Sequence, residues 1–349
     1  MLYDFIIVGQ GIAGSILSYT LLKQKQKVLV INNSQRNSSS LVAGGIFNPI
    51  TGKNLVKTWQ ADRLFPYMLQ FYQELEETLA SKFLHRVEIY RPFRSVQEQN
   101  DWLAKSTLPA FKDYLQETED THLQNDIFNP FGGISTLQAG WVDLPVLLAA
   151  YRTFLIGTDA YQEEDFEEDK IWVEQEKVLY KDLETRYLIF CTGAEAMRSD
   201  LWAFLPFSLV KGETIDISVP EAKFEKIVNQ GVSIVPLGKQ VYRVASTYNW
   251  KSLDWLCSQE AKQELSEKTK AILKKPFEII SQKAGIRPAT KHRRPMMGLH
   301  PQKKCIGVFN GLGSKGVSLA PYWAKHFTEH ILEKKALDLE VINVAKLKY

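Results

Sequence analysis

Cysteine is scarce in this sequence, and its few cysteines are scattered. The 349 residues include three, Cys191, Cys257 and Cys305, and no two of them form a C-x-x-C pair. Zinc clusters and disulfide frameworks need more thiols at closer, repeated spacings. We therefore expect no metal site and no disulfide bonds, and we interpret the scattered thiols as typical of a reducing, cytoplasmic setting.

Long apolar runs and a strong charge imbalance are missing as well. The apolar N-terminal stretch FIIVGQGIAGSILSYTLL is interrupted by glycines and has no positively charged segment before it, so we expect neither a signal peptide nor a membrane span. A net charge of +3 is too small to indicate a nucleic-acid binder by itself. With 45% hydrophobic and 24% charged residues, the composition is that of a globular protein with a large core.

A glycine loop near the N-terminus is the first positive signal. YDFIIVG predicts a strand, SILSYTLLKQ a helix and KVLVIN a second strand, and Gly9, Gly11 and Gly14 between them have G-x-G-x-x-G spacing. Such glycines permit a tight turn, a close approach to a pyrophosphate and close helix–strand packing, respectively. The βαβ context favours dinucleotide binding, while the alternative is that the glycines serve strand–helix packing alone.

The second strand of this unit departs from the usual pattern at its end. It finishes in Asn32-Asn33, where a dinucleotide-binding strand normally carries Asp or Glu for the ribose hydroxyls. An asparagine carbonyl accepts one such hydrogen bond, so the departure weakens the ribose contact without removing it. We include both asparagines among the expected cofactor-binding residues.

The rest of the chain predicts an α/β protein with an α+β second domain. Helices are expected over residues 60–85, after an N-cap at Asp143, over 258–275 and over 317–333. Residues 170–191 predict an antiparallel meander that ends in a buried strand, and residues 206–250 are rich in strands. We expect a Rossmann-like nucleotide-binding domain assembled from discontinuous segments, with an inserted, mainly antiparallel β-sheet substrate domain. The expected ranges are 1–85, 140–205 and 280–349 for the nucleotide-binding domain, and 86–139 and 206–279 for the substrate-binding domain.

Five further motifs, taken together, indicate which class of nucleotide-binding protein this is. SSSLVAGGIFNP, YLIFCTGAEA, SIVPLGKQVYRVASTYNW, AGIRPATKHRRPMMG and NGLGSKGVSLAP follow one another along the chain. Their order resembles the D-amino-acid oxidase superfamily of FAD enzymes, in particular the branch with glycine oxidase and monomeric sarcosine oxidase. The resemblance covers nearly the whole chain and is looser between residues 60 and 140 and between 250 and 280.

The resemblance implies a set of cofactor-binding residues. The phosphate loop would include Ile12 and Ala13, and Ser40 would reach the pyrophosphate. Small residues would lie along the flavin, and a second glycine loop would meet its ring, whereas Phe166 and the turn after residue 191 would lie at the adenosine half. These groups comprise Ala43, Gly44 and Gly45; Gly311, Gly313, Ser314, Lys315 and Gly316; and Thr192 and Gly193. The cysteine or histidine that tethers flavin in some relatives has no counterpart, and we expect Cys305 to be buried, so we predict noncovalent FAD.

The resemblance also implies substrate-binding residues. Arg287 in GIRP matches the arginine that holds the substrate carboxylate, a role that suits a bidentate guanidinium; the alternative is a salt bridge within a charged face. Lys315 matches a lysine that helps bind this carboxylate beside the flavin, with a solvated lysine as the alternative. Ser233 replaces the tyrosine that precedes IVP in the glycine-oxidase branch, so Tyr242 or Tyr248 is expected to supply that contact.

The implied reaction is oxidation of a C–N bond. A small amino acid or secondary amine would pass hydride to flavin N5, and O2 or another acceptor would reoxidise the flavin. The flavin performs this chemistry, so we assign no catalytic side chain and see no convincing Ser/His/Asp or paired-carboxylate pattern. One alternative is an FAD oxidase acting on carboxymethylaminomethyl uridine in tRNA, and another is a noncatalytic flavin-fold binding protein. Support for the tRNA alternative comes from a basic cluster: Arg287, Lys291, Arg293, Arg294, Lys303 and Lys304.

Overall fold

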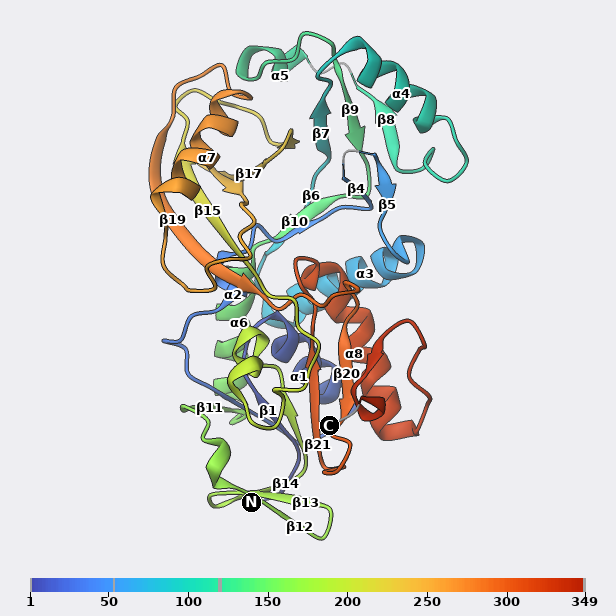
Figure 1. Cartoon of the computed structure of the whole chain (residues 1–349), viewed down its shortest axis with the longest axis vertical. Coiled ribbons are helices and arrows are strands. Elements are labelled where there is room, and N and C mark those ends of the chain that lie inside the picture. Colours follow the sequence, from blue (N-terminus) through green and yellow to red (C-terminus); the bar gives the residue numbers. More distant parts are fainter. Residues whose placement is uncertain (1, 53, 119–120, 348–349) are drawn as a thin grey trace.

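The chain forms two large sheets, one above the other along the long axis of the molecule (Figure 1). A computed structural model describes residues 2–52, 54–118 and 121–347. The lower sheet carries the N-terminal βαβ unit, and the upper sheet is built from the middle of the chain. No helix in these ranges is both long and apolar enough to cross a membrane.

The lower sheet is mainly parallel. Its strands lie in the order β11-β2-β1-β14-β21-β20-β22, and a β12-β13 hairpin extends β14. The first five strands of this order run parallel, so their carboxyl ends meet at one edge. The strands are β1 (Leu2–Val8), β2 (Val28–Asn32), β11 (Tyr161–Glu163), β12 (Ile171–Glu174), β13 (Lys177–Tyr180), β14 (Leu183–Phe190), β20 (Met296–Leu299), β21 (Ile306–Asn310) and β22 (Ile342–Asn343).

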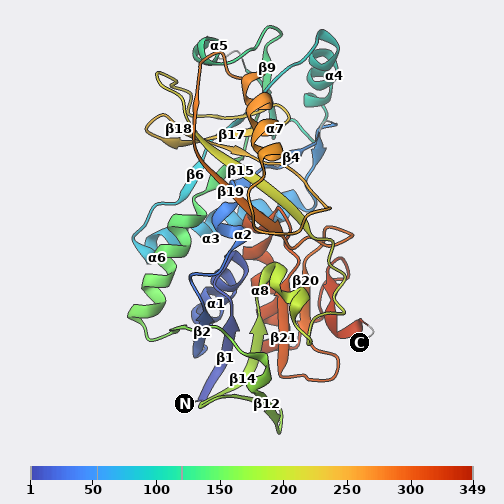
Figure 2. The ribbon, with the colours of Figure 1, turned by 60° about the vertical axis from the view of Figure 1, so that its left-hand side comes forward.

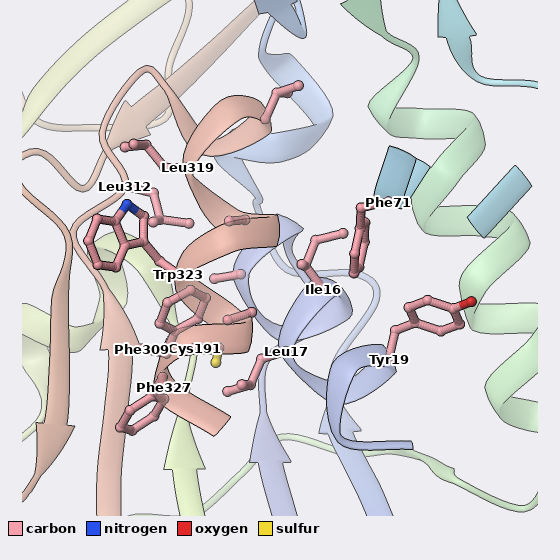
Figure 3. Close-up of a cluster of buried hydrophobic side chains, with 14 of the residues drawn as sticks. Ile16, Leu17, Tyr19, Phe71, Cys191, Phe309, Leu312, Leu319, Trp323 and Phe327 are labelled. Atoms are coloured by element: carbon pink, nitrogen blue, oxygen red, sulfur yellow. The ribbon is translucent and has the colours of Figure 1, made fainter. Parts of the chain in front are cut away.

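Both faces of this sheet are buried, as the apolar strand sequences require. On β1, Phe5 and Ile7 belong to one core cluster, whereas Ile6 and Val8 belong to a second on the opposite face. Helices α1, α3, α6 and α8 supply the first cluster, and Figure 3 shows side chains of α1 and α8 meeting in it. Their bounds are α1 (Ile12–Lys23), α3 (Ala61–Leu79), α6 (Leu144–Gly157) and α8 (Gly316–Glu333). The side chain of Asp143 accepts a hydrogen bond from Val146 N (3.2 Å), which confirms the predicted N-cap.

The upper sheet confirms the predicted antiparallel domain. Its order is β19-β15-β18-β17-β16-β7-β9-β8, and among these neighbours only the β16–β7 pair is parallel. The strands are β7 (Ile89–Pro92), β8 (Leu115–Glu117), β9 (Gly133–Thr136), β15 (Val210–Ser218), β16 (Ile227–Asn229), β17 (Ser233–Gly238), β18 (Val241–Ala245) and β19 (Glu278–Arg287). The domain boundary predicted at residue 280 falls within β19, and the ranges remain a prediction.

Shorter elements surround the two sheets. Helices α4 (Val96–Ser106), α5 (Thr121–Asp126) and α7 (Gln259–Lys270) lie beside the upper sheet (Figure 1). The 3-10 helices are η1 (Glu168–Lys170), η2 (Gly193–Arg198) and η3 (Val344–Lys346). In one small sheet, β10 (Gly140–Val142) lies between β3 (Ile46–Phe47) and β6 (Leu84–Arg86) and pairs with both. In a second, β4 (Ile50–Thr51) pairs with β5 (Val56–Lys57).

Helix α2 (Ser39–Val42) joins the two sheets. Ser39 Oγ donates a hydrogen bond to Ile286 O on β19 (2.5 Å), and a Cβ on Gly285 would lie 3.2 Å from Val42 Cβ. Figure 2 shows this helix between the lower sheet and strands β15 and β19 of the upper sheet. The carboxyl edge of the lower sheet therefore faces the upper sheet across a shared boundary.

Candidate active site

A cavity of about 1070 Å³ occupies this boundary. It is lined by the first glycine loop, the start of the loop after β2, helix α2 and its C-terminal glycines, the turn after β14, the second glycine loop and the inner face of the upper sheet. Its volume is in the range of cofactor and substrate pockets. Every predicted cofactor-binding residue lines it except Gly14 and Gly311.

The first glycine loop has the geometry of an anion site. Gly9 has φ of 98°, and Gly11 is the N-cap of α1, which has no side-chain cap. Ile12 N donates to Ser40 Oγ (3.0 Å), which brings the predicted pyrophosphate serine onto the loop. A Cβ on Gly14 would lie 1.8 Å from Gly9 O. Gly14 therefore allows close helix–strand packing, and the positive end of α1 faces the cavity.

The asparagine at the end of β2 stabilises this loop. Asn32 Oδ1 accepts the backbone N–H of Gln10 (2.9 Å), and its Nδ2 donates to Tyr161 Oη (3.3 Å). Arg152 of α6 also lines the cavity and donates from Nε to Gln10 Oε1 (3.1 Å). Asn33 lines the cavity too, so both asparagines lie where an adenosine ribose is expected.

The turn after β14 forms the adjoining wall of the cavity. Phe166 stacks on Tyr180 with ring centroids 4.2 Å apart, and Gly193, next to Thr192, has φ of 57°. Asn310 Nδ2 donates to Gly193 O (2.9 Å), which ties this turn to the end of β21. The wall is thus fixed from three separate parts of the chain.

Small residues line the opposite end of the cavity. A Cβ on Gly44 would lie 3.2 Å from Ala245 Cβ on the upper sheet, and Ala43 and Gly45 continue the lining. In the second loop, Gly313 has φ of 56° and lines the cavity with Ser314, Lys315 and Gly316. Gly311 has φ of 73° and shapes the turn without lining the cavity.

The Arg287 guanidinium lies within this end of the cavity. Its Nη2 donates to Ser246 Oγ (2.5 Å) and Thr247 O (3.1 Å), and it lies 4.4 Å from the Tyr248 ring centroid. Burial lowers the pKa of Arg287, and no carboxylate of the described chain is within ion-pair distance. Arg287 is thus a half-buried, oriented cation without a counter-ion among the described residues, which is the environment that binds a ligand anion.

Lys315 is the second cation at this end. Its Nζ donates to Thr58 Oγ1 (3.2 Å), and in the ranges that the structure covers it forms no ion pair. Burial, and then Arg293 and Arg294, lower the pKa of Lys315. The position at the start of α8 opposes the helix dipole, so the fold holds this charge at a cost.

The prediction for Tyr242 is wrong. Tyr242 stacks on Phe224 in the core of the upper domain and does not line the cavity. On β18 it is three residues from Ala245, which faces the cavity, and the alternation of a strand places the two on opposite faces. Tyr248, in the loop after β18, lines the cavity.

One arginine that sequence reasoning did not select also lines the cavity. Arg91 on β7 is 7% exposed and donates from Nε and Nη2 to Asn229 Oδ1 (3.2 and 3.0 Å). Asn229 Nδ2 donates in turn to Ser233 Oγ (2.8 Å). The only sequence signal is a charged residue within the apolar strand IYRP.

This cavity and fold define a flavoprotein, and comparison with known proteins identifies its family. Residues 4–330 match the DAO family, described as FAD dependent oxidoreductase. The match covers most of the chain, so the protein belongs to this family, is an FAD-dependent oxidoreductase and has FAD as its cofactor. The uncapped α1, Ser40 and the glycines that permit close approach are residues that fit this group.

Individual relatives place the chain near the glycine-oxidase branch. Glycine oxidase of Geobacillus kaustophilus (strain HTA426) is 23% identical over 352 residues, which cover 91% of this chain and 90% of the relative. The solved glycine oxidase structure from Geobacillus kaustophilus has a TM-score of 0.78 at 20% identity and covers 100% of both chains. Iminodiacetate oxidase from Chelativorans sp. BNC1 also has a TM-score of 0.78, at 17% identity, covering 97% of this chain and 99% of the other.

Proposed function

We propose that this protein oxidises the C–N bond of an amine that carries a carboxylate, such as a small amino acid or an N-substituted glycine. The observation that carries the proposal is Arg287, a half-buried guanidinium without a carboxylate partner in the described chain, at the end of the cavity where small residues allow close approach. The similarity to glycine oxidase supports the same substrate class.

Arg287 binds the substrate carboxylate in this proposal. Ser246, Thr247 and Tyr248 fix the guanidinium plane, so little side-chain entropy is lost when the anion arrives. Lys315 adds positive charge on the neighbouring loop. Together the two cations orient the substrate by its acid group and leave the amine end free to face the flavin.

Bound noncovalent FAD would supply the oxidising power by accepting hydride from the carbon next to the amine nitrogen. The chain's own residues position the substrate and exclude water around it. Thr214, Ala245 and Ser233 form a floor from the upper sheet, and Ala43 and Gly44 allow the close approach opposite it. The product imine then hydrolyses in water, and no protein nucleophile is required.

A flavin absorption spectrum followed by anaerobic titration tests the proposal. Glycine, sarcosine or iminodiacetate should bleach the flavin absorbance, whereas a carboxylate without an amine should shift the spectrum without bleaching it. A bound, oxidised flavin that is reducible but that none of these amines reduces would refute the proposal. That result would favour the alternative of a noncatalytic flavin-fold binding protein. Reoxidation with O2 and a peroxide assay would identify the acceptor.

The tRNA alternative loses part of its rationale in the structure. Lys303 and Lys304 precede β21, at the edge of the lower sheet opposite the cavity, whereas Arg287 lines the cavity. Arg294 lies 4.1 Å from the Trp59 ring centroid. The six basic residues therefore do not form one surface around the cavity, and we favour a small-molecule substrate.

A further inference from the structure

Charge is segregated along the cavity. All the acidic residues that line it within the described chain come from residues 164–200, beside the turn after β14. At the other end the charged lining residues are all basic: Arg91, Arg287, Arg293 and Lys315. A single substrate carboxylate does not neutralise the positive charge at this end. In the function proposed above, Arg287 and Lys315 already bind that carboxylate.

Arg91 and Arg293 are the basic residues of this end that the function leaves unused, and of the two only Arg91 is buried, since Arg293 is exposed. Arg91 Nη1 donates to Gly52 O (3.1 Å), and the guanidinium lies 5.4 Å from the Trp102 ring centroid. Burial lowers the pKa of Arg91 to about 10, with a smaller opposing effect of Glu98, whose Oε2 accepts the Arg94 N–H (2.6 Å). No carboxylate in the described ranges lies within ion-pair distance of Arg91. Its three hydrogen bonds leave two of the five guanidinium N–H groups for a ligand.

Strand register gives the separation of the two arginines. Ala245 on β18 is opposite Ser233 on β17, which is opposite Asn229 on β16. The Arg287 guanidinium contacts Ser246 and Thr247, directly after β18, and the Arg91 guanidinium contacts Asn229. Two strand spacings therefore separate β18 from β16, about 10 Å at the usual spacing between neighbouring strands, and this sets the scale of the separation between the two guanidinium groups.

Ser233 lies between the two arginines. Its Oγ accepts a hydrogen bond from Asn229, so its own hydroxyl proton is free to point into the cavity. Serine here, in place of a bulkier side chain, leaves room along the row from Ala245 to Arg91. The floor of the cavity thus carries the polar side chains of Ser233 and Asn229 between two arginines, Arg287 at one end and Arg91 at the other.

We propose that Arg91 forms a second anion site and that the substrate is an amine with two acid groups about 10 Å apart, one at Arg287 and one at Arg91. This inference rests on the proposed function and narrows its substrate class from a carboxylate-bearing amine to an elongated, dianionic one. The distal group is a carboxylate or a phosphate, since either accepts a bidentate guanidinium.

Binding of unreactive ligands to the FAD-loaded protein tests the site without turnover. The probes are linear dicarboxylates from malonate to sebacate, each compared with the monocarboxylate of the same chain length, and read by flavin absorbance and thermal stabilisation. Affinity should peak at a carboxylate separation of about 10 Å and there exceed that of the monocarboxylate by about tenfold or more. Replacing the distal carboxylate with a phosphonate distinguishes the two kinds of acid.

The variant Arg91→Met should remove this peak and leave monocarboxylate binding unchanged. Arg91→Lys keeps the positive charge but loses the bidentate geometry of the guanidinium, so it should retain part of the affinity peak. A wild-type series without a length optimum would overturn the inference even if neither variant folds, and so would a peak that survives Arg91→Met.

Reduction of the flavin separates this inference from the proposed function. N-(Carboxyalkyl)glycines should reduce the flavin with higher kcat/KM than N-alkylglycines of equal length. If N-alkylglycines bleach the flavin equally well, only the second anion site fails. If no amine bleaches the flavin while dicarboxylates still show the length optimum, the oxidase proposal fails and the site remains.

Discussion

Replacing Arg287 by methionine should separate ligand binding from stability, because the upper sheet contains a second arginine with the opposite environment. Arg243 on β18 makes a bidentate ion pair with Asp216 on β15 (Nε–Oδ1 2.7 Å, Nη2–Oδ2 3.1 Å) and does not line the cavity. Burial acts to raise the pKa of Asp216, but hydrogen bonds and charge from Arg243 outweigh it and leave that pKa lowered. Arg287 has no such partner among the described residues.

The expected magnitudes differ for the two variants. Arg243→Met leaves Asp216 buried without its counter-ion, which costs about 3 to 5 kcal/mol of unfolding free energy. Arg287→Met loses its bonds to Ser246 and Thr247 but also relieves the burial of an unpaired charge, so its unfolding free energy should change by about 1 kcal/mol or less. Loss of a charge-assisted pair of about 1.5 to 3 kcal/mol should lower kcat/KM for carboxylate substrates about 10- to 150-fold.

The assay combines urea unfolding of both variants with anaerobic flavin reduction. Glycine or sarcosine reports the carboxylate contact, and an amine without a carboxylate serves as the control substrate, whose kcat/KM should not depend on Arg287. The reasoning is refuted if Arg287→Met unfolds as easily as Arg243→Met while kcat/KM for glycine is unchanged. Arg287 would then be a structural residue.

Three further predictions concern the cofactor and the second loop. Gly14→Ala would place a Cβ 1.8 Å from Gly9 O, so it should cost about 1 to 3 kcal/mol and reduce the FAD that copurifies; Gly157→Ala, at a glycine with open space around its Cβ position, should change neither quantity. The lowered pKa of Lys315 means that the unfolded chain binds more protons just below pH 10.5, so unfolding free energy rises with pH there. Urea unfolding of Lys315→Met across this range should show a flatter rise, and an unchanged slope would contradict the assignment. Acid precipitation should release all the flavin into the supernatant, since Cys305 is buried away from the cavity; flavin in the pellet would indicate a covalent link.

Much of the fold follows from local patterns in the sequence. The glycine spacing between two strands, the Asp143 cap and the helix expected over 317–333 each depend on nearby residues, and the structure confirms them. The resemblance of ordered motifs then predicted residues that line one cavity, from Gly9 to Gly316. Local chemistry and motif order together were sufficient to predict most of these lining residues, and their contacts with FAD stay a prediction.

The substrate end was harder to predict, because it depends on strand pairing over long distances. Arg91 belongs to the cavity only because β7 pairs with β16, and no motif in its own segment indicates this contact. Tyr242 was misplaced because a motif match ignores the alternation of a strand, which its distance from Ala245 could have exposed. Asn32 lines the cavity, but its bond to Tyr161 depends on a strand far away in the sequence, which the motif itself does not indicate.

The order of strands in the lower sheet also determines when the cofactor site can exist during synthesis. β14 lies between β1 and β21, and the latter begins only at Ile306. When synthesis has reached β14 but not β21, one edge of β14 has no neighbouring strand, and the second glycine loop of the FAD site is still missing. An unpaired strand edge can pair with another chain, so aggregation competes with folding at this stage. The second glycine loop follows β21 directly and is therefore synthesised only after that strand. The two glycine loops can thus hold one flavin together only once β21 has been added beside β14.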